Sequence, residues 1–323
     1  MNTTRKILID TDTASDDAVA LIMALRSPDV KVLAITVVAG NVSVEQGARN
    51  ALFTVELCQS PVPIFSGARA PLVRPLEDGV WFHGRNGLGD HGYQPASRLT
   101  EDEFAVNAMV RVIEANPGIE LITLGPLTNL ALALRQSPQL AENVSRCVVM
   151  GGAPCCEGNV TPAAEYNFWV DPEAARVVLR SQLPIELVGW QLSRGAAVVK
   201  GHEIDEILAL RTSFAEFAIR ANDTAAQAYR TQTREVGIAL PDPTAMAILL
   251  DPALALVSSG HFMDVQVDSR ITRGMSVVDK LGVAEDARNR AAWSEVLDRG
   301  RKHKVIWEMD IPGWKQSLLR ALA

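Results

Sequence analysis

Aromatic residues are scarce in this chain of 323 residues, where they make up 5% of the sequence. Lysine and arginine number 31 against 38 aspartates and glutamates, which gives a net charge of -7, and no block rich in lysine or arginine occurs. Proteins that bind the nucleic-acid backbone need concentrated positive charge, and those that bind single strands often stack bases on aromatic rings. The composition therefore argues against a nucleic-acid partner.

Long apolar runs and paired cysteines are also missing. No stretch approaches the ~20 apolar residues that a membrane span needs, and the start "MNTTRKILID" has no apolar signal-peptide core. None of the four cysteines forms a C-x-x-C pair, so we expect neither a zinc site nor a redox dithiol. These absences predict a cytoplasmic protein with no membrane partner.

Hydrophobic residues make up 48% of the chain and fall in short runs that alternate with helical patterns. Near-continuous apolar runs are typical of parallel strands that helices cover on both faces. The predicted strands are 5–10, 31–38, 62–65, 119–124, 146–150 and 185–189. The predicted helices between them are 16–27, 44–59, 101–115, 127–136 and 172–182. This alternation predicts an α/β fold with a mostly parallel, doubly wound, Rossmann-like sheet.

The second part of the chain changes character, although no linker rich in Pro, Ser or Gly precedes it. We expect helices over 200–235 and 243–250, a β-hairpin formed by 261–268 and 272–279, and a late strand near 304–310. The sequence therefore predicts a single domain, residues 1–323, in which extra C-terminal helices and a hairpin are added to the sheet.

Polar clusters follow most of the predicted strands. In doubly wound sheets, ligands bind beyond the carboxyl ends of the strands, where such clusters would meet. The clusters are "DTDTASDD" after the first strand, "AGN" (39–41), "LGPLTN" (124–129), "MGGAPCCEGNVTPAAEYN" (150–167) and "GWQLSRG" (189–195). We expect the chemistry of the protein at this edge of the sheet.

The first cluster gathers four aspartates, Asp10, Asp12, Asp16 and Asp17. The helix dipole favours acidic residues in a first turn, which would explain Asp16 and Asp17 but not the other two. Crowded carboxylates take up protons or share a cation, and oxygen ligands without His or Cys suit Ca²⁺ or Mg²⁺. One candidate chemistry is a Mg²⁺-dependent phosphotransferase of the haloacid-dehalogenase type, with Asp10 as nucleophile, although Ala14 stands where its D-x-D-x-[TV] pattern has Thr or Val.

The same stretch resembles the D-x-D-x-x-x-D-D fingerprint of the nucleoside hydrolases, the inosine–uridine-preferring family, with Thr13-Ala14 in place of the usual Pro-Gly. The resemblance continues in family order over essentially the whole chain. The further segments that carry it are "AGN" (39–41), "HGRNGLGD" (83–90), "GPLTNLAL" (125–132), "MGGAPCCEGNVTPAAEYNFWVDPEAA" (150–175), "PDPTAMA" (241–247) and "GMSVVD" (274–279).

This resemblance implies cleavage of the N-glycosidic bond of ribonucleosides to ribose and a free base, with a tightly held Ca²⁺ as cofactor. Asp12, Asp17 and Asp242 match the metal-ligand carboxylates, and Leu124 matches the residue that offers a backbone carbonyl to the metal. Asp12 also matches the general base that takes a proton from a metal-bound water. The expected partner is a small-molecule nucleoside.

Ribose recognition falls, by the same resemblance, to six residues: Asp16, Asn41, Met150, Asn159, Glu165 and Asn167. Carboxylates and amides suit ribose hydroxyls, which both donate and accept hydrogen bonds. If the segment around Glu165 and Asn167 is extended, both side chains point the same way. Asn159 and Asn167 could instead be turn-forming residues.

Two positions depart from the family pattern. Many members carry histidine before the last metal-binding aspartate, where this chain has Pro241, which can donate no proton. His83, in the "HG" loop, is the candidate substitute for protonating the leaving base, unless it is a solvated loop histidine. Trp190 stands where an aliphatic residue is common, and its indole could stack on the base or fill the core.

Two other function classes stay open at this stage. One is a protein that binds nucleoside or ribose and keeps the metal pocket without turnover, and the other is the phosphotransferase. The family resemblance also suggests a homodimer or a homotetramer.

Overall fold

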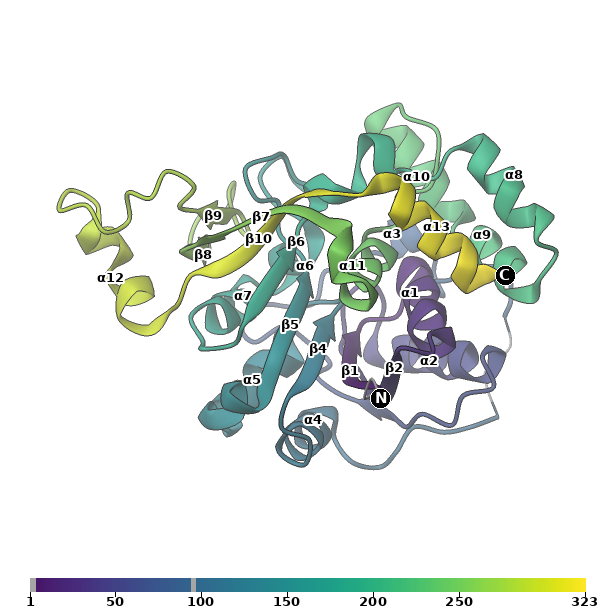
Figure 1. The fold of residues 1–323 in the computed structure, drawn as a ribbon, viewed down its shortest axis with the longest axis horizontal. Helices are drawn as coiled ribbons and strands as arrows, with labels where there is room; N and C mark the ends of the chain where they lie inside the picture. Colours follow the sequence, from purple (N-terminus) through teal and green to yellow (C-terminus); the bar gives the residue numbers. More distant parts are fainter. Residues whose placement is uncertain (1–3, 94–96) are drawn as a thin grey trace.

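An eight-stranded sheet forms the centre of the computed structural model, which describes residues 4–93 and 97–323 (Figure 1). The strand order is β3-β2-β1-β4-β5-β6-β10-β7, and all neighbours pair in parallel except β10 and β7. The strands are β1 (Arg5–Thr11), β2 (Val30–Val37), β3 (Ile64–Ser66), β4 (Ile119–Thr123), β5 (Val144–Met150), β6 (Ile185–Val188), β7 (Ala255–His261) and β10 (His303–Met309). The predicted mostly parallel, doubly wound sheet is confirmed.

Helices cover both faces of this sheet. Buried side chains of α1, α2, α9, α11 and α13 pack on one face, and those of α4, α5 and α7 pack on the other. The helices are α1 (Ser15–Arg26), α2 (Val44–Leu57), α3 (Val80–His83), α4 (Ala105–Glu114), α5 (Thr128–Gln136), α6 (Tyr166–Val170), α7 (Pro172–Leu179), α8 (Gly201–Ala209), α9 (Ser213–Ala221), α10 (Asp223–Thr233), α11 (Pro241–Leu250), α12 (Arg290–Arg299) and α13 (Ile311–Leu322). The sheet is thus buried on both sides, as its apolar strands require.

The C-terminal third differs from the sequence expectation in detail. The helical segment 200–235 is divided into α8, α9 and α10, and the expected hairpin is confirmed as β8 (Met263–Val265) and β9 (Ser276–Val278), shorter than predicted. Strand β7 was not predicted, because its exposed edge position leaves it without an apolar run. Figure 1 shows that the hairpin and α12 project from the body beyond β7 and β10.

The direction of chain winding reverses between β1 and β4. From β1 the chain proceeds outward to β2 and β3, and then returns to place β4 on the other side of β1. In sheets of this order, the loops that follow the two strands on either side of the reversal separate and leave a crevice for ligand. The acidic segment after β1 and the "LGPLTN" segment after β4 therefore lie side by side at the carboxyl edge of the sheet.

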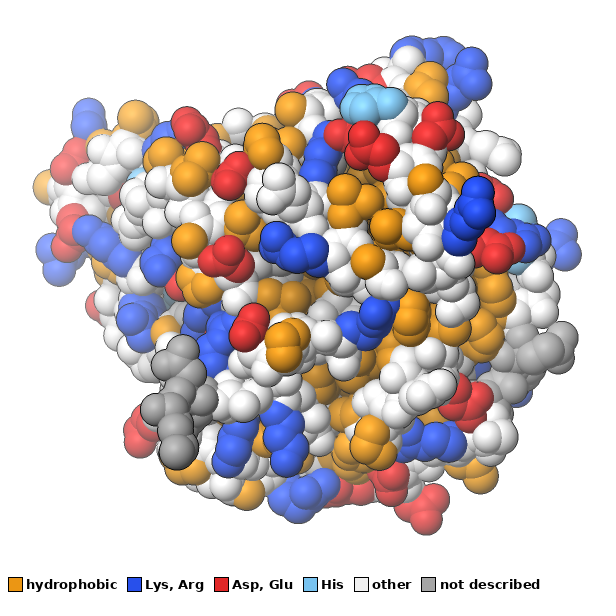
Figure 2. Space-filling model, turned by 45° about the vertical axis from the view of Figure 1, so that its right-hand side comes forward, with side chains coloured by type: hydrophobic (Ala, Val, Ile, Leu, Met, Phe, Trp, Pro, Cys, Tyr) orange, Lys and Arg blue, Asp and Glu red, His pale blue; other side chains and the backbone are white. Residues whose placement is uncertain are grey.

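Charges of both signs are interspersed on the face that Figure 2 presents, with hydrophobic side chains between them. This distribution gives that face no single-sign area of the kind that binds a polyanion. Among the described residues, no helix has the length and apolarity to cross a membrane.

Candidate metal and nucleoside site

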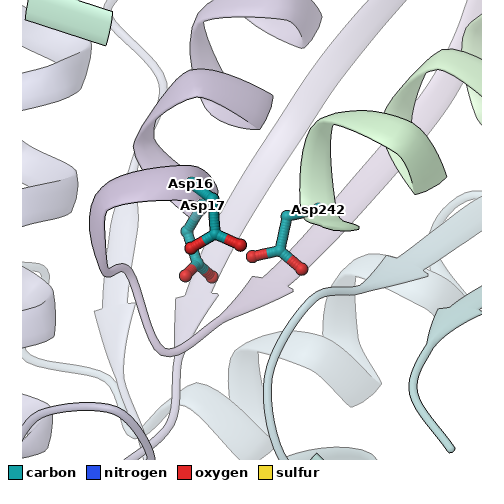
Figure 3. Close-up of side chains that lie close together, drawn as sticks. All are labelled: Asp16, Asp17 and Asp242. Carbon is teal, nitrogen blue, oxygen red and sulfur yellow. The ribbon is translucent and has the colours of Figure 1, made fainter. Parts of the chain in front are cut away.

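Three buried aspartates meet where the first helix and helix α11 converge (Figure 3). Asp16 and Asp17 lie in the first turn of α1, and Asp242 lies in the first turn of α11, directly after Pro241. One carboxylate oxygen from each lies within 4.8 Å of the others. The two helix starts thus bring residues from distant parts of the sequence into one acidic cluster, and both helix dipoles favour negative charge there.

Asp12 adjoins this cluster from the end of β1 and is completely buried. Its Oδ2 accepts a hydrogen bond from the Asn41 backbone N–H at 2.5 Å, whereas its Oδ1 has no partner among the described residues. Two glycines leave room for this carboxylate, since a Cβ on Gly40 would lie 2.2 Å from Oδ2 and a Cβ on Gly125 would lie 2.7 Å from Oδ1. The "AGN" and "GPLTN" segments therefore form a cradle for Asp12.

Asp17 is fixed by its own loop, because Thr11 Oγ1 donates to its Oδ1 at 2.5 Å and the Ala14 N–H donates to its Oδ2 at 2.9 Å. Burial raises the pKa of Asp16 to about 6, and burial together with the charge of Asp16 raises the pKa of Asp17 to about 6. Burial and the neighbouring aspartates raise the pKa of Asp12 and of Asp242 well above the usual range. Without a compensating cation, these carboxyl groups would take up protons.

The donor set fits a hard divalent cation. Asp12 Oδ1 and Asp16 Oδ1 are buried without a hydrogen-bond partner among the described residues, and the cluster offers carboxylate oxygens alone. The Leu124 carbonyl, expected as a further ligand, follows β4 and accepts a hydrogen bond from Asn167 Nδ2 at 2.8 Å, which leaves it a second lone pair. The compact group contains Asp16, which the sequence assigned to ribose, while Asp12 lies beside it.

A pocket of about 630 Å³, open on one side, lies above the cluster. This size is typical of small-molecule sites. Apart from the fully buried Asp12 and Asp17, all of the predicted site residues line it: Asp16, Asn41, His83, Leu124, Met150, Asn159, Glu165, Asn167, Trp190 and Asp242. The structure thus brings together residues from seven separate segments of the chain.

The segment around Glu165 is helical rather than extended, so that expectation was wrong. Glu165 is the N-cap of α6, and its carboxylate accepts the backbone N–H groups of Gly152 (2.7 Å) and Asn167 (2.9 Å). Burial raises its pKa to about 7. Asn159 Oδ1 accepts the Tyr166 N–H at 2.9 Å, so it closes this loop as well as lining the pocket. Glu165 and Asn159 therefore shape the wall on which Asn167 is presented.

His83 is buried, so it is not a solvated loop histidine. Its Nδ1 lies 2.8 Å from Ser15 Oγ and 3.8 Å from Asp16 Oδ1. Burial lowers the pKa of His83 to about 4, so the ring is neutral near pH 7. The opposite edge of the ring is free of any hydrogen bond to the described residues, and the side chain lines the pocket.

The other wall of the pocket is apolar and aromatic. Trp190 is buried in the 3₁₀ turn after β6 and packs with Val198, Tyr229 and Ala239, yet it also faces the pocket. Sequence reasoning missed Trp81 and Phe82, which line the same pocket from α3. Their position directly before His83 was the available signal. Pro241 lies on this wall too, as an apolar ring beside Asp242.

Comparison with known proteins places this geometry. The family model described as inosine-uridine preferring nucleoside hydrolase matches residues 7–316. The chain belongs to the inosine-uridine preferring nucleoside hydrolase family. A non-specific ribonucleoside hydrolase, RihC, from Salmonella paratyphi B is 37% identical over 328 aligned residues, which cover 100% of this chain and 99% of the relative.

Solved structures agree with the family assignment. A plant nucleoside hydrolase, PpNRh1, superposes with a TM-score of 0.91 at 30% identity, covering 99% of each chain. A second structure, an inosine-guanosine nucleoside hydrolase, superposes with a TM-score of 0.86 at 32% identity and covers 98% of each chain. Nucleoside hydrolases act on the N-glycosyl bonds of ribonucleosides, and this enzyme class is the one to which the chain belongs.

The nucleoside hydrolase assignment leaves no support for a phosphotransferase. The nucleophile in that alternative would be Asp10, which is completely buried. Thr36 Oγ1 donates to Asp10 Oδ1 at 2.6 Å and Asn129 Nδ2 donates to the same oxygen at 2.9 Å. Asp10 therefore ties β1 to β2 and to α5 beneath the pocket, and it does not line the pocket wall.

Proposed function

We propose that this nucleoside hydrolase cleaves ribonucleosides to ribose and free base with Ca²⁺ as cofactor and Asp12 as the general base. The observation that carries the proposal is the buried acidic cluster at the floor of a pocket with one polar and one aromatic wall. A ribose fits the polar wall next to the cluster, and a planar base fits the aromatic wall. The scissile bond then lies between the two walls.

Ca²⁺ would be held by Asp12, Asp17, Asp242 and the Leu124 carbonyl, and when bound it neutralises the clustered carboxylates and orients the attacking water. The residues fit this role because their oxygens are hard donors and because two of the carboxylate oxygens nearby lack a partner. The Asp16 carboxylate, which lines the pocket and belongs to the same cluster, is shared between this centre and the ribose hydroxyls.

Asp12 takes the proton of the attacking water. The hydrogen bond from the Asn41 backbone fixes Oδ2, so the unpartnered Oδ1 is the oxygen available as base. The water oxygen bonds to the anomeric carbon of ribose while the electron pair of the broken C–N bond leaves with the base. The ribosyl group passes through an oxocarbenium-like state, whose positive charge the surrounding carboxylates stabilise.

His83 assists the departure of the base. Its Nδ1 faces Ser15 Oγ, which directs its Nε2 edge to the pocket. With the serine hydroxyl donating to Nδ1, the neutral ring carries its proton on Nε2 and donates it to the base as the C–N bond breaks. Pro241 cannot supply this proton from the opposite wall.

Ribose hydroxyls would contact Asp16, Asn41, Met150, Asn159, Glu165 and Asn167, and the base would stack on Trp190. The aromatic wall contributes area without directional hydrogen bonds, so it favours tolerance of different bases. This agrees with the name of the Salmonella relative, a non-specific ribonucleoside hydrolase.

A direct test measures release of reducing sugar and free base from inosine, adenosine, uridine and cytidine, with protein loaded with Ca²⁺. We expect turnover, and we expect Asp12→Asn to lower kcat by about 10²–10⁴-fold while the protein stays folded, because the amide matches the carboxylate in size. A fully active Asp12→Asn variant would contradict the role of Asp12. Tight calorimetric binding of nucleoside without any release of sugar would instead support the binding-protein alternative.

We also propose a homodimer or homotetramer and a cytoplasmic location, as the sequence predicts. Light scattering of the purified protein gives the first directly, since the monomer mass is 34.9 kDa. Fractionation of the source cells gives the second.

A further inference from the structure

A row of alternating charges crosses the amino edge of the sheet, opposite the pocket. It runs over adjacent strands from Arg5 (β1) to Glu120 (β4), Arg146 (β5), Glu186 (β6) and Lys304 (β10). Successive nitrogen–oxygen distances are 3.1, 3.6, 2.6 and 2.7 Å. Glu120 is the register partner of Arg146, and Glu186 is that of Lys304, so the pairing follows from the strand alignment itself.

The two arginines of this row also hold the end of helix α11. Arg5 donates to the carbonyls of Leu249 (2.9 Å) and Leu250 (2.7 Å). Arg146 donates to those of Leu249 and Ile248, each at 3.0 Å. The backbone N–H of Asp251 donates to Ala247 O at 2.8 Å.

The last four carbonyls of a helix have no partner within the helix, and here all four, from Ala247 to Leu250, are satisfied. Two guanidinium groups satisfy three of them, and their positive charge also matches the negative end of the helix dipole. Each fork binds a carboxylate and the helix end together: Arg5 through Glu120, and Arg146 through Glu186. The helix end is therefore tied to four strands of the sheet.

Helix α11 needs such an anchor because its own surface gives little axial register. Residues 242–249 are all buried, and apart from Asp242 and Thr244 this stretch is made of proline and aliphatic side chains. Apolar packing is non-directional, so it resists sliding along the axis less than hydrogen bonds do. No side chain caps the amino end, where the N-cap is Leu240.

The amino end of this helix carries Asp242, about 12–15 Å from the arginines along the axis. Strands β1 and β4 run from the same charged row to the acidic loop and to Leu124 at the pocket. A shift of the helix against these strands would change the distance from Asp242 to the other ligand oxygens directly. The row thus fixes the helix relative to the strands that deliver the remaining ligands.

We propose that Arg146 and Arg5 are positioning residues of the cation site, which set the axial position of α11 and thereby the place of Asp242. The inference rests on the proposed Ca²⁺ function. Replacement of either arginine weakens cation binding although neither residue lies near the cation.

The test is calorimetric titration of chelator-treated protein with Ca²⁺ alone. We expect Arg146→Met to weaken Ca²⁺ affinity by about 10-fold or more, the range seen when outer partners of metal ligands are removed. Arg5→Met should weaken it in the same direction, and Arg146→Lys should lie between Arg146→Met and the unaltered protein, because lysine keeps the charge but loses the fork. If Arg146→Met does not fold by circular dichroism, Arg5→Met and Arg146→Lys decide the matter.

Two control variants separate positioning from general destabilisation. Arg74→Met removes a comparably buried fork, which binds Glu173 and the Val267 carbonyl at 2.7 Å away from α11, and it should leave Ca²⁺ affinity within about twofold. Glu186→Gln keeps the bonds of Arg146 to the helix and should do the same. Affinities of the arginine variants within twofold of the unaltered protein would overturn the positioning role, whereas no uptake of Ca²⁺ by the unaltered protein would overturn the proposed cofactor itself, and the inference with it.

Discussion

Ser15 Oγ lies 2.8 Å from His83 Nδ1, and both side chains are buried. Ser15 opens α1 directly before Asp16 and Asp17, so the helix that carries the acidic cluster also holds the histidine. The family fingerprint leaves this position variable, and the serine is thus a feature of this chain. It gives His83 a defined ring orientation although the histidine comes from a separate short helix.

Ser15→Ala should lower kcat for nucleosides by about tenfold, the worth of one buried hydrogen bond, because the ring of His83 loses its orientation. The matched measurement uses 4-nitrophenyl riboside, whose leaving group departs without a proton. Hydrolysis of that substrate should stay unchanged. An equal loss on both substrates would mean that Ser15 supports the fold of the site rather than the departure of the base.

Gly40→Ala should abolish turnover, because the new Cβ would lie 2.2 Å from Asp12 Oδ2 and displace that carboxylate. Gly201→Ala is the control, since no atom lies within 4 Å of a Cβ built there. We expect the control to keep full activity and to gain slightly in stability from the better helix former. Steady-state rates and thermal unfolding of the two variants check both statements, and an active Gly40→Ala enzyme would contradict the cradle.

Trp81→Ala should raise KM about tenfold if the exposed indole stacks on the base, since stacking contributes ~1–3 kcal/mol. Half of the Trp81 side chain is exposed (51%), so thermal stability should not change. Trp190→Ala, by contrast, removes a buried ring and should cost about 3–5 kcal/mol of unfolding free energy besides its effect on KM. Equal KM values for the unaltered and Trp81→Ala enzymes would place the base elsewhere.

The metal-free protein should be more stable in mild acid than at neutral pH. Folding raises the pKa of Asp16 and Asp17 from 3.8 to about 6 and those of Asp10 and Glu165 to about 7. The folded state therefore binds more protons than the unfolded chain between these values, and stability falls as pH rises through that window. His83 acts in the opposite direction, because its lowered pKa of about 4 disfavours the folded state in acid.

The acidic groups outnumber the histidine, so protein treated with chelator should melt at a higher temperature at about pH 5.5 than at about pH 7.5. Bound Ca²⁺ favours the ionised carboxylates, and its addition should remove or reverse this difference. Differential scanning calorimetry with and without Ca²⁺ measures both effects. The same pH trend in both samples would show that the cation does not bind these aspartates.

The sequence predicted the parallel sheet and most of the pocket because both depend on local patterns. Apolar runs marked the strands, and the polar segments after them had to meet at one edge. It could not predict that Glu165 caps a short helix, since α6 spans five residues and lacks a helical period. Nor did it find Trp81 or β7, whose places depend on tertiary packing and on an exposed edge.

Asp242 illustrates both limits. The motif "PDP" identified it as a partner of the first aspartates, but nothing in the sequence shows how it reaches them. The buried helix α11 and the arginines at its far end bring it into place, and neither Arg5 nor Arg146 stands in a recognisable motif.

The acidic loop leaves the ribosome early, while Asp242 and strand β10 follow only when most of the chain has been synthesised. A nascent chain therefore displays the first aspartates without the residue that completes their cluster. Ion capture must coincide with the final stage of synthesis, when α11 docks and β10 enters the sheet between β6 and β7. Interrupted translation products would thus carry the fingerprint of the enzyme but no way to retain its cation.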